Sequence, residues 1–344
     1  MRAVVVVVVI LLAIIGALIH PLSLLLGVTP FDSRGIILFL NEAKSVIADV
    51  LGWAIVGLLA LMLALVIRGR LLPRGSSGSR RPVTTLDSTK MAVSIIAFNE
   101  AGAIGDLVRA FKAQEDVVDV IVIDNNSTDA TADIACIAGA RVIEEPKQGY
   151  GYACIRGLKE GLQVPEADVV VLTEGDGTFA AEDLPKFSAY IRQADMVVGN
   201  RVVSSLVEDG SQMDYFFTWG NIAVGSLLRL RFWHPQFLGA ASISDVGCTY
   251  RAIRKDALKT VLADLSVGGN HFSPHMLLIA LHRGLCLIEI PVTLRRRIGA
   301  SKGAGRAFWP GFQVGLVMIW HILTYSPAHR QVEASKQVAT IAKS

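Results

Sequence analysis

The sequence predicts an α/β domain with a mostly parallel sheet, preceded by two transmembrane helices that form an N-terminal hairpin. Short apolar runs alternate with helical patterns between residues 91 and 302. Strands that alternate with helices in this way form parallel sheets with right-handed crossovers. Two long uncharged stretches occupy much of the first 67 residues, and a segment rich in Gly, Ser, Pro and Arg separates them from the α/β pattern.

The composition supports membrane attachment. The chain has 344 residues, of which 52% are hydrophobic and 18% charged, and its mean hydropathy of +0.49 is too high for an ordinary soluble enzyme. No Asp, Glu, Lys or Arg occurs from Ala3 to Phe31 or from Val50 to Ile67. A spanning helix needs about 20 apolar residues, so we expect spans at about 4–26 and 47–67. A cleaved signal peptide is the alternative for the first stretch, but no small-residue cleavage site closes it before Pro21.

The distribution of charge predicts the topology. Arginines at 68, 70, 74, 80 and 81 follow the second span, whereas the loop between the spans has balanced charges. By the positive-inside rule, the α/β domain then lies on the cytoplasmic face of the cell inner membrane. The basic residues gather at the membrane junction and at 295–306, which favours anionic lipid over nucleic acid as their partner. The four cysteines have no metal-ligand spacing and suit a reducing compartment.

We divide the chain into five segments: the hairpin (1–67), a basic flexible linker (68–90), the α/β domain (91–302), an amphipathic helix (303–326) and a tail (327–344). The uncharged stretch 308–325 is only marginally long enough to span a membrane, and Pro310 weakens it, so we favour an interfacial helix over a third span. The aromatic-rich segment 212–240 either packs against the domain or lies among lipid headgroups.

Polar residues recur at the ends of successive predicted strands, where an open α/β sheet binds its ligands. They are Asn99 and Glu100; Asp124 with Asn125, Asn126, Ser127 and Asp129; Lys147, Gly149 and Gly151; and Glu174 with Asp176. Asn and Ser after a strand also make turns and helix caps, and that alternative stays open for 125–129. On a glycine-flanked loop, Glu174 and Asp176 can turn to the same side, where a hard cation such as Mg²⁺ or Mn²⁺ would relieve their repulsion.

The ordered series IIAFNE, VIVIDNNSTDAT, KQGYGYA, TEGDGTF, GNR, DVGCTYRAIRKDAL and RRRIGASKG resembles the family-2 glycosyltransferases, which have the GT-A fold. It is most similar to the dolichyl- and polyprenyl-phosphate sugar synthases, over residues 91–302. The resemblance implies a membrane-bound inverting transferase that moves a sugar from a nucleotide diphosphate to a polyprenyl phosphate, as in the synthesis of cell-envelope glycans. A metal at the acidic pair would neutralise the charge that grows on the departing diphosphate.

The resemblance also implies residue roles. The nucleotide sugar is assigned to Ala97, Asn99, Glu100, Asp124, Asn126, Lys147, Gly149 and Glu174. Glu174 and Asp176 take the place of the Asp-x-Asp metal motif. The acceptor phosphate is assigned to Arg251, Arg296, Ser301 and Lys302, and catalysis to Asp176, Arg201, Arg296 and Lys302. The last three residues of the phosphate set match the Arg-x-x-Gly-x-Ser-Lys element of the family.

This sequence departs from the pattern of the family in places. Glu174 replaces the first Asp of the metal motif, and His271 and His275 stand where relatives often have glutamates. Residues Gly177 to Phe179 follow the pattern GDGTF, whereas dolichyl-phosphate mannose synthases have an acid and then Gln there. A hydroxyl acceptor would need a general base, for which His275 is a candidate, although a lone His is more often structural. A non-catalytic nucleotide-sugar-binding membrane protein is the rival hypothesis. A dinucleotide oxidoreductase is disfavoured, because no Gly-x-Gly-x-x-Gly follows the first strand.

Overall fold

The computed structural model describes residues 89–211, 213, 215–232, 243–299 and 308–325, and five isolated positions before residue 89. The chain divides into two compact units, Met1–Arg68 and Gly69–Ser344. In the first unit only four helical positions between 53 and 60 are described. The predicted spans, the linker and the tail therefore lie almost wholly outside the described residues. Within those residues, no helix combines the length and hydropathy that a bilayer crossing requires.

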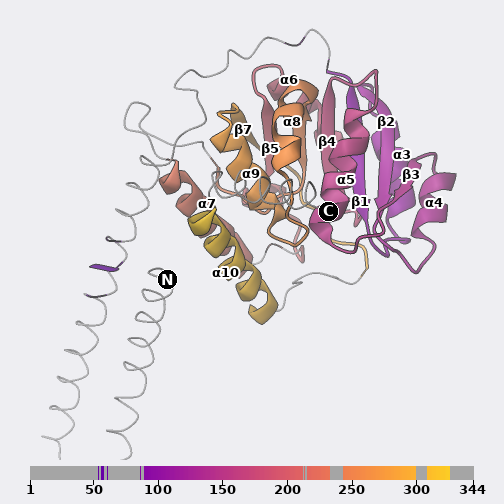
Figure 1. The fold of residues 1–344 in the computed structure, drawn as a ribbon. Coiled ribbons are helices and arrows are strands. Elements are labelled where there is room, and N and C mark those ends of the chain that lie inside the picture. The colour runs from indigo at the N-terminus through magenta and orange to yellow at the C-terminus, as the bar shows by residue number, and fades with distance from the viewer. Residues whose placement is uncertain are drawn as a thin grey trace, which may run out of the picture. The chain divides into compact units, whose positions relative to one another are not determined.

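A seven-stranded sheet forms the centre of the second unit, with the order β3-β2-β1-β4-β6-β5-β7 (Figure 1). The strands are β1 (Met91–Ala97), β2 (Val117–Asp124), β3 (Arg141–Glu144), β4 (Val169–Glu174), β5 (Met196–Asn200), β6 (Arg251–Arg254) and β7 (Leu287–Pro291). β1 pairs in parallel with β2 and β4, whereas β6 runs antiparallel to both of its neighbours. The prediction of a mostly parallel α/β sheet is confirmed.

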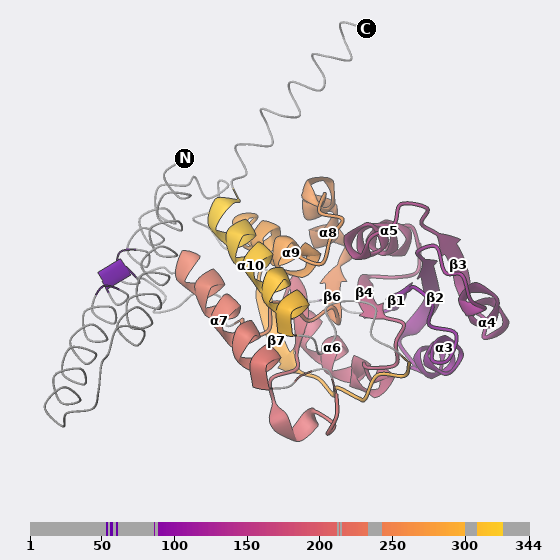
Figure 2. The same cartoon turned by 90° about the horizontal axis from the view of Figure 1, so that it is seen from below.

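Helices cover both faces of the sheet. They are α3 (Ile104–Lys112), α4 (Thr131–Ile137), α5 (Tyr150–Leu162), α6 (Leu184–Ile191), α7 (Tyr215–Arg231), α8 (Lys255–Val261), α9 (Phe272–His282) and α10 (Phe308–Thr324). Seen from below, α5, α8 and α9 lie on one face, and α3 and α6 on the other (Figure 2). Because strand side chains alternate, Ala92 and Ile96 of β1 pack into the first layer, while Val93 and Ile95 pack into the second.

α7 and α10 lie side by side (Figures 1 and 2). A buried arginine joins them. Arg231, at the end of α7, is 2% exposed and donates to the carbonyl oxygens of Ile322 and Tyr325. Those carbonyls lie at the end of α10, where backbone acceptors lack helical partners. For segment 212–240 the described part thus packs against the domain along one side, whereas Trp219 on the same helix is 55% exposed.

The close approach of α5 to the sheet depends on two glycines that face it. A Cβ on Gly161 would lie 2.5 Å from Cγ1 of Val170, and one on Gly157 would lie 3.0 Å from Cβ of Ser94. The Ser94 hydroxyl donates to the Gly157 carbonyl at 2.7 Å, so the helix is also bonded to the strand there. No side chain fits between helix and sheet at these positions.

We expect Gly161→Ala to destabilise the protein, although alanine favours an isolated helix by about 1 kcal/mol. The clash with Val170 forces overpacking, which costs about 1–3 kcal/mol. Gly220→Ala in α7 is the matched control, because nothing lies within 4 Å of the added Cβ. Thermal unfolding should show a lower midpoint for Gly161→Ala and none of this loss for Gly220→Ala; equal midpoints would contradict the packing described here.

Candidate active site

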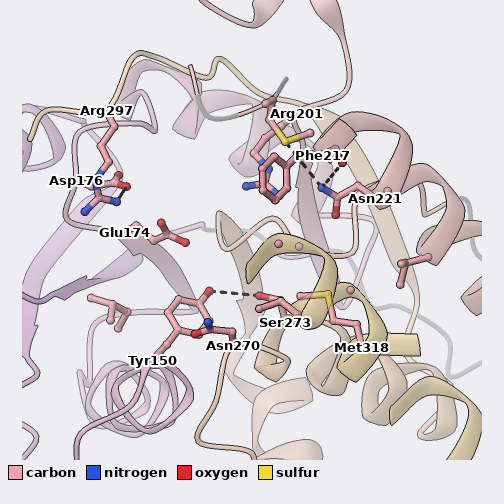
Figure 3. Close-up of a pocket in the computed structure, with 18 of the residues that line it drawn as sticks. Tyr150, Glu174, Asp176, Arg201, Phe217, Asn221, Asn270, Ser273, Arg297 and Met318 are labelled. Carbon is pink, nitrogen blue, oxygen red and sulfur yellow. Dashed lines mark hydrogen bonds and ion pairs between the residues drawn. The ribbon is translucent and has the colours of Figure 1, made fainter. Parts of the chain in front are cut away.

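One cavity of about 610 Å³ opens at the carboxyl ends of β1 and β4 and extends to α7 and α10 (Figure 3). Its polar wall includes Glu100, Asn125, Glu174, Asp176, Arg201 and Arg297. Its apolar wall includes Phe217, Val224, Phe312, Leu316, Met318 and Ile319. Acidic, basic and apolar surfaces therefore border a single space, at the edge of the sheet where the sequence predicts ligand binding.

A tight turn after β4 brings Glu174 and Asp176 to this cavity (Figure 3). Glu174 is in register with Ile96 of β1, and the N–H of Gly175 donates to the Ile96 carbonyl at 2.8 Å. A Cβ at residue 175 would lie 3.1 Å from that carbonyl oxygen, and Gly177 has a φ of +77°. The two glycines thus let the chain turn across the end of β1 while both acids keep their side chains on the cavity.

Asp176 is 2% exposed and both of its carboxylate oxygens are engaged. Oδ1 accepts hydrogen bonds from the backbone N–H of Thr178 at 3.0 Å and from its hydroxyl at 2.6 Å. Oδ2 accepts from Nη1 of Arg297 at 2.5 Å. The other terminal nitrogen of Arg297 donates to Glu100, so one guanidinium bridges two carboxylates from different strand ends.

Glu174 is the less compensated of the two acids that follow β4. The Thr249 hydroxyl donates to Oε1 of Glu174 at 2.5 Å and is itself bonded to the Tyr150 hydroxyl. Burial, followed by repulsion from Asp176, raises the pKa of Glu174 to about 7, although Thr249, Arg201 and Arg297 act in the opposite direction. An additional positive charge beside Glu174 would therefore stabilise the ionised form of this acid.

Arg201 is fixed at the edge of the cavity by a buried acid. Its Nε and Nη2 donate to the two carboxylate oxygens of Asp245 at 2.8 and 2.9 Å, and its backbone N–H adds a third bond at 3.0 Å. Burial opposes the charge of Asp245, but Arg201 outweighs it and holds the pKa of that carboxyl below its usual range. The guanidinium is thereby presented in one orientation, as a bidentate pair requires.

The predicted nucleotide residues form two neighbouring loops joined by an asparagine. The side-chain NH₂ of Asn125 donates to the carbonyls of Glu145 and Lys147, and its Oδ1 accepts from the Gly149 N–H, each at 2.9 Å. The turn-forming alternative for 125–129 thus holds for Asn125, which also lines the cavity. Asn126 adopts a φ of 64° and bonds the carbonyl of Pro146 at 3.0 Å.

Asp124 lies at the end of β2 and is buried, with Oδ2 accepting from the Ser127 N–H at 3.3 Å. Its Oδ1 is buried and has no hydrogen-bond partner among the residues that the structure describes. Asn99 bonds Ser127 and Thr128 across the same loops. Of the predicted nucleotide residues, Ala97, Glu100 and Glu174 line the cavity, whereas Asn99, Asp124, Asn126, Lys147 and Gly149 do not.

Two of the residues assigned to the acceptor phosphate, Arg251 and Arg296, do not lie where that role would require. Arg251 is 1% exposed and donates to the carbonyls of Val246, Cys248 and Ser273 at 2.7–3.0 Å, so its guanidinium supports the site from beneath. Arg296 is exposed and points away, donating to the Asp209 carbonyl at 2.8 and 3.1 Å. Neither lines the cavity. Ser301 and Lys302 lie outside the described residues.

Arg297, Tyr150 and Thr249 reach the site although the sequence interpretation gave them no role. The family motif drew attention to Arg296, but side chains alternate along an extended chain and place Arg297 on the opposite side. This alternation was the available signal. Tyr150 and Thr249 could not have been found in this way, because Thr249 lies 75 residues along the chain from Glu174 and 99 residues from Tyr150, and it is hydrogen-bonded to both.

His275 and His271 do not line the cavity. His275 is 1% exposed, and its Nδ1 lies 2.9 Å from Nε2 of His321 on α10. The ring of His271 packs edge-on against the same His321, and burial lowers the pKa of His271. The two histidines thus form part of the contact between α9 and α10. Among the described residues, no group of three or more His, Cys, Asp or Glu side chains could hold a metal ion.

Comparison with known proteins agrees with these features. A family model described as "Glycosyl transferase family 2" matches residues 92–262. The chain is 32% identical over 213 residues to a dolichyl-phosphate hexose transferase of Haloferax volcanii, covering 62% of this chain and 86% of the relative. It is 30% identical over 203 residues to an undecaprenyl-phosphate mannosyltransferase of Micrococcus luteus, covering 54% of this chain and 76% of the relative.

A solved structure shares the fold. It is glucosyl-3-phosphoglycerate synthase from Mycobacterium tuberculosis in complex with Mn²⁺, uridine-diphosphate-glucose and phosphoglyceric acid. It matches with a TM-score of 0.50 and 17% identity, over 69% of this chain and 78% of that one. From the family model, and from two relatives of which more than three quarters is covered, this chain belongs to glycosyl transferase family 2 and resembles the polyprenyl-phosphate sugar transferases in it.

Proposed function

We propose that the protein is a membrane-bound, metal-dependent inverting transferase that moves a sugar from a nucleotide diphosphate to a polyprenyl phosphate on the cytoplasmic face. The observation that carries this proposal is the continuity of the cavity, which has charged residues at one end and apolar side chains of α7 and α10 at the other. A polyprenyl phosphate has the same division, with an anionic head and an apolar chain. The names of the two relatives, a dolichyl-phosphate and an undecaprenyl-phosphate transferase, support the same acceptor class.

The outer surfaces of α7 and α10 suit an interfacial position, in line with the predicted interfacial helix. Trp219, Trp309 and Trp320 are between 47 and 68% exposed, and Val317 of α10 is 46% exposed. Tryptophan favours the boundary between headgroups and acyl chains, where an apolar ring with one polar N–H is best accommodated. Helices held at that depth would bring the apolar wall of the cavity to the lipid chain of the acceptor.

The groups around the cavity favour a phosphate acceptor over a hydroxyl. A phosphate is anionic near neutral pH and needs positioning and charge shielding, whereas a hydroxyl needs a general base. Arg201 and Arg297 line the cavity and offer shielding. His275, the candidate base, is packed against His321 away from the cavity.

Glu174 and Asp176 fit a divalent cation such as Mg²⁺ or Mn²⁺. Burial and then repulsion from Asp176 raise the pKa of Glu174, so a cation beside the pair would favour its charged form, and Mg²⁺ is commonly held by one or two carboxylates together with substrate phosphates. When bound, the metal would stabilise the charge of the leaving diphosphate. The chain itself would orient the carboxylates through Thr249 and Thr178 and hold Arg201 in place through Asp245.

The proposal is tested by a panel of donors and acceptors. Detergent-purified protein with Mn²⁺ should transfer label from one of a set of UDP- and GDP-sugars to undecaprenyl or dolichyl phosphate, with inversion at the anomeric carbon. Labelling of a hydroxyl lipid alone would identify a glycolipid synthase instead. Nucleotide binding that ignores divalent metal, with no transfer to any acceptor, would favour the non-catalytic protein.

Asp176→Asn should lower turnover by at least about 100-fold, since it removes a carboxylate that would hold the metal needed to stabilise the leaving diphosphate, while the bonds from Thr178 keep the loop in place. Initial rates with the best donor measure the loss, and the thermal unfolding midpoint checks the fold. Wild-type turnover in this variant would show that the metal assignment is incorrect.

Glu174→Gln should stabilise the protein in EDTA, to an extent that depends on pH. The pKa of Glu174 rises from 4.5 in the unfolded chain to about 7 in the folded one, so the folding free energy contributed by this acid declines as pH increases through that interval. Glutamine does not ionise. The midpoint of the variant should exceed that of the wild type by roughly 5 °C above pH 7.5 and converge with it near pH 4.5. A difference that is constant with pH would refute this assignment of charge.

A further inference from the structure

The guanidinium of Arg297 lies between two acids of the site, in the kind of position that a metal cation would take. Its side chain is 13% exposed, and its two terminal nitrogens contact Oδ2 of Asp176, at 2.5 Å, and Oε1 of Glu100. Its Nε is also buried and has no hydrogen-bond partner in the described part of the chain. Two acids from the ends of different strands thus share one guanidinium that retains an unused donor. Figure 3 shows Arg297 beside Asp176.

The neighbouring arginines are directed elsewhere, so this position belongs to Arg297. Arg295 is paired with Glu182 at 3.2 Å on the surface, and Arg296 bonds the carbonyl of Asp209. The backbone on either side of Arg297 is bonded to the acidic loop. The N–H of Arg295 donates to the backbone carbonyl of Thr178 at 2.8 Å, and the N–H of Ile298 donates to the backbone carbonyl of Asp176 at 3.2 Å. Movement of the guanidinium therefore requires only rotation of its side chain.

Arg297 and a divalent cation compete for the same carboxylate. Oδ1 of Asp176 already accepts two hydrogen bonds from Thr178, which leaves Oδ2, the oxygen bonded to Arg297, for a metal. A metal bound there would lie within roughly 4–5 Å of the guanidinium, and two cations at that distance in a buried site repel strongly. Both cannot keep these positions at once.

We propose that Arg297 is an exchangeable counter-cation. It holds Asp176 and Glu100 until a divalent metal takes Asp176, and the released guanidinium then binds the diphosphate of the donor. The inference deepens the proposed function and rests on it in one respect, that a metal binds at Asp176. A planar guanidinium with several donors suits a diphosphate, which offers pairs of anionic oxygens. Metal and donor binding would consequently be linked through one side chain.

The test uses the full-length protein in detergent and Mn²⁺ as the probe, with free Mn²⁺ followed by electron paramagnetic resonance. Arg297→Gln should bind Mn²⁺ alone about tenfold more tightly than wild type, because the competing charge-assisted bond is gone. Arg297→Lys keeps the charge without the bridging geometry and should fall between them. Arg295→Gln removes an equal charge from the same segment, outside the site, and should match the wild type.

The second half of the test uses nucleotide. At saturating Mn²⁺, calorimetric titration with UDP and GDP should show binding to Arg297→Gln weakened about tenfold, since the guanidinium no longer reaches the diphosphate. Tighter binding of Mn²⁺ together with weaker binding of nucleotide by Arg297→Gln supports the exchange. Unchanged or weaker Mn²⁺ binding by Arg297→Gln overturns it, as does unchanged nucleotide binding.

The outcome is separable from that of the proposed function. If no lipid is glycosylated but the two affinities move in opposite directions, the exchange stands and only the proposed acceptor is rejected. If no variant binds Mn²⁺, with or without nucleotide, the metal dependence and the exchange are both overturned. Thermal unfolding of each variant confirms that the affinities belong to folded protein.

Discussion

The crowding of three carboxylates at the carboxyl ends of β1 and β4 is the constraint on which the site depends. Glu100, Glu174 and Asp176 line one cavity, and their charges repel in surroundings largely closed to water. The protein offsets part of this repulsion with Arg297, which bridges two of the acids, and with Arg201, whose charge acts on the third. Burial, together with the remaining repulsion from Asp176, raises the pKa of Glu174. The ionised form of Glu174 therefore lowers stability at this position, and a bound cation would offset that loss.

The same cavity explains why α7 and α10 belong to the functional unit. Both helices contribute apolar side chains to the wall opposite the acids, and both expose tryptophan on their outer surfaces. Arg231 joins them by bonding the last carbonyls of α10, and His321 joins α10 to His275 of α9. The sequence made His275 a candidate for catalysis, but its contact with His321 instead holds α10 against α9.

Periodicity in the sequence was sufficient to predict the sheet, because the core strands are nearly continuous β-branched runs bounded by polar turns. It also identified the acidic pair, since glycines on both sides signal a turn. The antiparallel direction of β6 depends on contacts between distant segments, which local patterns do not encode, whereas alternation along the chain was a local signal for the inward position of Arg297. Arg251 was misassigned for a related reason: an arginine in a recurring position can serve the backbone as well as a ligand, and only burial distinguishes the two.

Glu174 shows how a departure from a family pattern can be absorbed by its surroundings. Its extra methylene, relative to aspartate, extends the carboxylate toward Thr249, whose hydroxyl is itself held by Tyr150 at the start of α5. Tyr150 in turn lies 3.3 Å from the Ser273 hydroxyl, and the Ser273 carbonyl accepts from the buried Arg251. Three hydroxyl side chains therefore connect the acid at the end of β4 to the buried Arg251. Since a longer side chain has more rotamers to lose, this chain of bonds supplies the orientation that a shorter acid would have by default.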